Sequence, residues 1–165
     1  DNVSNNAPAQ FPVGTTTVTW TVTDIHGNTA TCNQTVTVVD NQPPTFTRPP
    51  DITIYRNTTC GYNASVSATG DVTNEADNCG VGQATYSDII DNSDACNLII
   101  TRTWHLVDNN GNHAADQVQT ITVRDNIPPT FSAPTNITIY TNSICSYNAS
   151  PTLTGNVTNE SDNCS

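Results

Sequence analysis

The nine residues TTTVTWTVT at positions 15–23 place Val18, Trp20 and Val22 at every second position, with threonines between them. Successive side chains of a β-strand point to opposite faces, so the three apolar residues share one face and the intervening threonines share the other. This pattern predicts a half-buried strand. Asp24-Ile-His-Gly27-Asn28 follows and is typical of a tight turn, and residues 29–39 are predicted to form the return strand.

The same hairpin recurs later in the chain, as predicted strands at 98–107 and 115–124 joined by a turn at 108–112. Further short strands are predicted at 52–55, 64–69, 81–87, 137–140 and 149–154. Short alternating strands at this spacing indicate an all-β fold of the β-sandwich type. Helical periodicity is not found.

A long block of sequence occurs twice. Residues 46–79 return as residues 131–164, with 21 of 34 positions identical and no gap. A period of this length indicates an array of whole domains and not a solenoid of small units. The chain is therefore predicted to be part of a tandem-module protein.

Two Pro-Pro pairs, at 43–44 and 128–129, mark the predicted module boundaries, because proline lacks the N–H of a central strand and stiffens a linker. Residues 43–127 are predicted to be a complete module. Residues 1–42 resemble the C-terminal half of a module, and residues 128–165 the N-terminal half. We expect the chain to be one circularly cut unit of a longer two-module period, in which a neighbouring copy completes the split module.

The composition is strongly acidic, with 15 Asp and Glu against four Lys and Arg and a formal net charge of −11. Such a surface repels nucleic acids and anionic membranes and attracts divalent cations. No apolar run approaches the length needed to span a membrane. Nucleophile elbows, metal-binding histidine pairs and phosphate loops are not found, so the sequence indicates a protein that is not an enzyme.

Acidic and amide side chains gather in two equivalent loops, 71–78 and 156–163, and at the two module junctions. Calcium takes six to eight oxygen ligands, which such loops can supply. The alternative is that Asp and Asn cap turns and keep the surface hydrated. The candidate calcium ligands are Asp40, Asp71, Glu75, Asp77, Asp125, Glu160 and Asp162.

Six cysteines in an extracellular-type composition indicate an oxidising compartment. Each repeat contains one cysteine pair with a spacing of 19 residues, which favours the disulfides Cys60–Cys79 and Cys145–Cys164. This leaves Cys32 and Cys96 unassigned. The alternative joins Cys60 to Cys96, and Cys164 to Cys32 of a following copy.

Nine N-x-S/T sequons are present, a modest excess that agrees with an extracellular surface. Trp20 and Trp104 lie on apolar strand faces, which favours a place in the core over a carbohydrate-stacking platform. The candidate glycosylation sites are Asn2, Asn33, Asn57, Asn63, Asn136, Asn148, Asn156, Asn159 and Asn163.

The segment FPVGTTTVTWTVTD at 11–24, with GNTATC at 27–32, VTVVD at 36–40 and Pro43-Pro44, resembles the hyalin repeat (HYR) module. The module at 43–127, with ADNC at 76–79 and ITRTW at 100–104, is similar to repeats of giant surface adhesins of gliding and marine Bacteroidetes. The resemblance implies tandem immunoglobulin- or fibronectin-like sandwiches, secretion to the cell surface, and a role in adhesion or as a stalk.

The partners that follow are neighbouring repeat modules of the same chain or fibre, with surface glycans or proteins as further candidates. Two other functions remain open. One is a module that binds glycans or proteins directly, and the other is an accessory module of a secreted enzyme. Calcium is the only cofactor that the sequence suggests.

Overall fold

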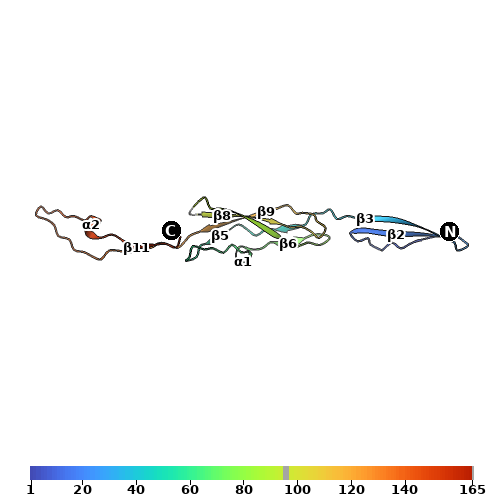
Figure 1. Cartoon of the computed structure of the whole chain (residues 1–165), viewed down its shortest axis with the longest axis horizontal. Helices are drawn as coiled ribbons and strands as arrows, with labels where there is room; N and C mark the ends of the chain where they lie inside the picture. The colour runs from blue at the N-terminus through green and yellow to red at the C-terminus, as the bar shows by residue number, and fades with distance from the viewer. Residues whose placement is uncertain (95–96, 165) are drawn as a thin grey trace. The chain divides into compact units, whose positions relative to one another are not determined.

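The computed structural model describes residues 1–94 and 97–164, and the regular secondary structure in them is almost entirely β-strand (Figure 1), which confirms the predicted all-β fold class. Two helices of four residues each are the exceptions. The elements are β1 (Asn2–Asn5), β2 (Gly14–Thr23), β3 (Thr29–Val38), β4 (Thr45–Thr47), β5 (Ile52–Tyr55), α1 (Val66–Thr69), β6 (Thr73–Ala76), β7 (Thr85–Asp91), β8 (Asn97–His105), β9 (Gln117–Arg124), β10 (Thr130–Ser132), α2 (Pro151–Thr154) and β11 (Thr158–Ser161).

The chain forms two compact units. The first consists of Asp1–Thr47, Asn74–Thr85 and His105–Asp116, and the second of Arg48–Thr73, Tyr86–Trp104 and Gln117–Ser165, of which residue 165 lies outside the described part. Neither described helix is long enough to cross a membrane. The module boundaries expected at the two Pro-Pro pairs stay a prediction.

In the first unit, β2 and β3 form the hairpin that the alternating threonines predict, and β1 adds to the other edge of β2. The pairing runs without a bulge from Gly14 opposite Val38 to Thr23 opposite Thr29. The sheet order is β1-β2-β3, so within the described residues one edge of β3 has no strand beside it.

The second unit is built on a four-stranded sheet in the order β5-β9-β8-β7. Strands β8 and β9 pair antiparallel, whereas β5 adds to β9 in parallel, with Ile52 opposite Ile121 and Ile54 opposite Val123. The core consists of Leu98, Ile100, Ile121 and Val123, and it is covered by Ile52, Ile54, Tyr62 and Ala64.

Arg102 is buried at the centre of β8, at 1% exposure, because it shares the inward face of that strand with the buried residues Ile100 and Trp104. Its guanidinium forms a bidentate ion pair with Asp88, with N–O distances of 2.8 Å. It also donates to Thr69 Oγ1 at 2.8 Å and to the carbonyl of Ala64 at 2.7 Å. Tyr86 lies 4.1 Å from the guanidinium carbon, ring centroid to Cζ. The buried cation is thus paired with a carboxylate and forms further hydrogen bonds, as burial requires.

The two copies of the repeated block fold locally in the same way. Strand β4 pairs with β6, and β10 pairs with β11. Each copy has a helical turn that ends at a glycine with positive φ, Gly70 at 96° and Gly155 at 91°. A Cβ at Gly70 would lie 2.9 Å from Pro49 Cβ, and one at Gly155 would lie 2.7 Å from Pro134 Cβ, so both positions require glycine.

Several expected strands differ from the structure. Residues 64–69 and 149–154 contain the helical turns α1 and α2, because the Ser65 and Ser150 carbonyls accept bonds from residues three and four positions on. Only the last part of 81–87 belongs to a strand, β7. Residues 137–140 are not a strand, although the identical sequence ITIY forms β5 at 52–55. Local sequence alone therefore does not decide whether this segment is a strand.

Replacing Asp88 with alanine leaves the buried Arg102 charge without its carboxylate, and we expect a loss of about 3 kcal/mol in the free energy of unfolding. Asp116→Ala is the matched control, because it breaks the exposed pair of Asp116 with His105. That change is expected to cost less than about 1 kcal/mol. Urea unfolding of both variants measures the difference, and equal losses would contradict the assigned role of Arg102.

Candidate functional site

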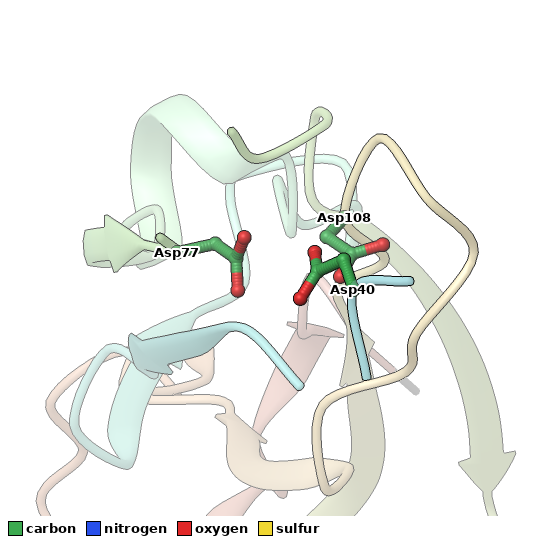
Figure 2. Close-up of side chains that lie close together, drawn as sticks. All are labelled: Asp40, Asp77 and Asp108. Atoms are coloured by element: carbon green, nitrogen blue, oxygen red, sulfur yellow. The ribbon is translucent and has the colours of Figure 1, made fainter. Parts of the chain in front are cut away.

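Three aspartates from separate segments of the first unit lie close together. Asp40 follows β3 in the linker, Asp77 follows β6, and Asp108 opens the turn after β8. One carboxylate oxygen of each lies within 4.8 Å of the others. Figure 2 shows Asp77 directed toward Asp40 and Asp108 from the opposite side. We call these three residues the acidic trio.

The turn at 108–112 determines where Asp108 lies. Oδ1 of Asp108 accepts hydrogen bonds from the backbone N–H groups of Asn110 and Asn112, both at 2.8 Å, and Oδ2 accepts from Asn112 Nδ2 at 2.7 Å. Gly111, with φ of 94°, closes the turn. Asp108 is only 6% exposed. The burial raises its pKa, but the hydrogen bonds from Asn112, Asn110 and Gly111 together outweigh it, so the pKa is lowered.

The same turn forms hydrogen bonds with Asp40, which follows β3. Asn110 Nδ2 donates to Asp40 Oδ2 at 2.9 Å, and Asn112 Nδ2 donates to the carbonyl of Asp40 at 3.3 Å. Asp77 accepts a bond from the N–H of Cys79 at 2.8 Å. Hydrogen bonding through Asn110 and Asn112 therefore keeps Asp40 close to Asp108, although their like charges repel each other.

Cys79 lies beside the acidic trio. Desolvation raises the pKa of its thiol, and the negative charges of Asp40 and Asp77, a hydrogen bond with Asp40 and the charge of Asp108 raise it further. A thiol with a raised pKa is mostly protonated at neutral pH, which lowers its reactivity as a nucleophile.

The structure brings together two of the candidate calcium ligands, Asp40 and Asp77. The third residue of the trio, Asp108, was not predicted from the sequence. Its signal was present in the sequence, because Asp24…Gly27-Asn28 and Asp108…Gly111-Asn112 repeat the same turn. Asp24 accepts from His26 N, Asn28 N and Asn28 Nδ2, as Asp108 does from its own turn. Asp108 could therefore have been predicted as a site residue, because an aspartate opens the same turn in both places.

The remaining candidates lie outside the trio. Asp71 accepts a bond from the N–H of Val72, and Glu75 and Glu160 are exposed on β6 and β11. Asp125 accepts bonds from Ile127 N and from Asn163 Nδ2, which favour the charged carboxylate and lower its pKa. Asp162 accepts from Cys164 N through Oδ2. Asp125 and Asp162 are the repeat equivalents of Asp40 and Asp77.

The disulfide of the structure joins Cys60 to Cys164, with the Cα atoms 5.0 Å apart. The expected pairs Cys60–Cys79 and Cys145–Cys164 are therefore wrong, and so is the alternative that joins Cys60 to Cys96. Equal spacing within each repeat suggested a bond that closes inside a repeat. The structure instead closes it between repeats, because the loop that carries Cys60 meets the turn at Asp162 and Asn163: Asn163 Nδ2 donates to Asn57 O at 3.1 Å.

Cys32, Cys79 and Cys145 are free and exposed, and Cys96 lies outside the described residues. Eight of the nine sequon asparagines are exposed, and Asn163, whose side chain bonds to Asn57 and Asp125, is half-buried. Trp104 is 1% exposed, as a core residue should be. Trp20 is 39% exposed and donates from Nε1 to Gln34 Oε1 at 2.9 Å, so the core expectation fails for it here.

A family model for the HYR domain matches residues 1–38, which comprise β1, β2 and β3. HYR domains are extracellular, adhesion-associated and non-catalytic modules. The match includes the hairpin of β2 and β3 with its alternating threonines. The N-terminal segment of this chain is thus similar to an extracellular adhesion module.

Proposed function

We propose that the chain is a structural repeat segment of a secreted, cell-surface fibre or giant adhesin, of the kind known from Bacteroidetes. Its task is to extend a stalk and to bear load, not to transform a substrate. The HYR match, the acidic surface and the long internal repeat support this assignment. An accessory module of a secreted enzyme is a weaker alternative, because the residues that the repeats share have structural roles in turns.

The disulfide between Cys60 and Cys164 is the observation that carries the proposal. Cys60 lies in the first copy of the repeated block and Cys164 in the second, so the bond crosses the predicted boundary between consecutive modules. A covalent bond across this boundary shortens the length of chain that can extend under force. This is a mechanical role, and it needs no binding pocket.

Pulling single chains from both ends tests this role. With the disulfide intact, the segment between Cys60 and Cys164, a separation of 104 residues, stays closed. Reduction should then release about 350 Å of additional contour length. Cys60→Ser should behave as the reduced chain does, and Cys145→Ser as the oxidised chain. An unchanged contour length after reduction would refute the load-bearing assignment.

We further propose that the acidic trio binds calcium and stiffens the junction at which Asp40 lies. Three carboxylates from three segments offer hard oxygen ligands, and water can complete the coordination. The cation would offset the repulsion among Asp40, Asp77 and Asp108. It would also link the linker to the turn at 108–112, which already bonds to Asp40.

Adding calcium should raise the melting temperature of the wild-type chain, because a ligand bound only to the folded state stabilises it by about 2.7 kcal/mol at a hundredfold excess over Kd. Asp77→Asn should abolish this gain. Asp71→Asn is the matched control, since Asp71 lies outside the trio, and it should keep the gain. A melting temperature that does not respond to calcium or to a chelator would contradict the site.

A module that binds glycans or proteins is the second candidate function. Its supporting observation is a hollow of about 570 Å³ in the second repeat, beside the exposed rings of Tyr140 and Tyr147. Exposed aromatic rings next to a hollow suit sugar rings.

A further inference from the structure

We propose that Asn110 is a site of spontaneous deamidation. In this reaction the backbone nitrogen of Gly111 attacks the side-chain amide of Asn110, and the amide becomes a carboxylate next to Asp40. Both residues belong to the turn at 108–112, which lies in the first unit together with Asp40. The inference goes beyond the proposed function, because it assigns a chemical modification and not a mechanical role.

The sequence selects this position. Asn110 is the one asparagine among 22 that is followed by glycine. The nitrogen that attacks belongs to the residue after the asparagine, and a side chain on that residue hinders the approach. Glycine has no side chain and a permissive backbone, so an Asn-Gly pair reacts with the least steric hindrance. We therefore expect the reaction to be fastest at this position of the chain.

The structure leaves the pair open to the reaction. Asn110 and Gly111 are both exposed, and a Cβ placed on Gly111 would meet no atom within 4 Å apart from its chain neighbours. The N–H of Gly111 donates to the carbonyl of Asp108 at 3.4 Å, which is longer than the usual range of about 2.7–3.2 Å. The nitrogen that must attack is therefore held by a weak hydrogen bond, and water can reach the pair.

The turn itself does not require asparagine at this position. The aspartate that opens the turn at 24–28 accepts the same three hydrogen bonds as Asp108, although His26 stands where the later turn has Asn110. An imidazole has no amide carbon for the following nitrogen to attack. Residues 24–28 are thus an inert version of the same turn and serve as a control inside the chain.

The amide of Asn110 holds Asp40. Its Nδ2 donates to Asp40 Oδ2 at 2.9 Å, and Asn112 Nδ2 donates to the Asp40 carbonyl at 3.3 Å. An ionised carboxylate has no hydrogen to donate. Aspartate at position 110 would therefore replace the shorter of these two bonds with a pair of like charges, which repel each other. Deamidation thus weakens the attachment of the segment that follows β3.

The reaction takes place in two steps. The nitrogen of Gly111 loses its proton and bonds to the side-chain carbonyl carbon of Asn110, and the side-chain nitrogen leaves as ammonia, which gives a cyclic imide. Water then opens the ring at either of its two carbonyl carbons. One water molecule is consumed and one ammonia molecule is released, and no atom is oxidised or reduced.

The two ways of opening the ring give different products. Breaking the bond to the former side-chain carbon gives aspartate, and breaking the bond to the backbone carbon gives isoaspartate, in which the main chain is one carbon longer. The longer chain changes the spacing of the N–H groups of residues 110 and 112, which both bond to Asp108 Oδ1 at 2.8 Å. Both products therefore end the donation to Asp40, and isoaspartate also disturbs the turn.

One consequence rests on the proposed calcium site. A carboxylate at position 110 lies next to Asp40, so it adds a further acidic ligand beside the acidic trio. The affinity of a calcium site depends on the number of charged ligands. Deamidation would therefore lower the stability of the calcium-free chain and increase its response to calcium.

Peptide mapping by mass spectrometry tests the modification, after the 165-residue chain has been incubated at neutral and at alkaline pH. The peptide that contains residues 110–111 should gain one mass unit and separate into an aspartate and an isoaspartate form. The gain should be faster at alkaline pH, because hydroxide removes the proton from the attacking nitrogen. The peptide that contains residues 24–28 should keep its mass. Circular dichroism verifies that the chain stays folded.

Asn110→His is the matched control, because it gives the turn at 108–112 the residue found at position 26. This variant should not gain mass in the same peptide. A wild-type peptide that keeps its mass in the folded chain would overturn the proposal. An equal gain in Asn110→His would also overturn it, since the reaction would then take place at another asparagine of the turn.

Thermal unfolding of Asn110→Asp tests the effect on Asp40. Without calcium, its melting temperature should fall below that of the wild type, and high salt should reduce the difference because salt screens exposed charges. Asn109→Asp is the matched control, since it adds the same charge to the neighbouring exposed residue, and it should lower the melting temperature less. Equal losses in the two variants would contradict the role assigned to the bond with Asp40.

Adding calcium distinguishes the modification from the calcium site. Asn110→Asp should gain more in melting temperature than the wild type, and an equal gain would reject position 110 as a further ligand. If neither chain responds, the calcium site is rejected, whereas the mass of the peptide still decides the deamidation. If calcium stabilises the wild type and the peptide keeps its mass, the deamidation is rejected and the calcium site stands.

Discussion

The buried guanidinium of Arg102 is the interaction on which the second unit depends. It joins β8 to Asp88 on one side and to Thr69 and Ala64 on the other, so one side chain ties the sheet to the repeated block that covers it. A buried charge is costly unless it is fully paired, and the pairing here requires both layers to be in place. Gln119 adds a second tie, since its amide donates to Thr69 O and Pro50 O.

Short polar turns form hydrogen bonds with the segments that follow β3 and β9. The turn at 108–112 bonds to Asp40, and Asn163 bonds to Asp125 and to Asn57. These contacts bring together cysteines from consecutive repeats. The acidic trio lies beside the segment that follows β3, and the disulfide lies beside the segment that follows β9.

Much of the fold could be predicted from the alternation of apolar and polar residues along the chain. The alternating residues at 15–23 predict β2, and the corresponding hairpin of the central module was placed within a few residues of β8 and β9. The candidate site was predicted only in part. Asp40 and Asp77 were recognised as acidic residues near a junction, but Asp108 was not, because its turn is about 30 residues from Asp77 and only folding brings them together.

The sequence by itself determined the all-β class, the repeat and the turn chemistry, because these depend on residues near one another along the chain. Tertiary structure decided the disulfide partner of Cys60, the membership of the acidic trio and the state of the two ITIY segments. Those features depend on which surfaces meet. One ITIY segment is a strand because β9 lies beside it, and the identical one is not, since a strand exists only through hydrogen bonds to a neighbour.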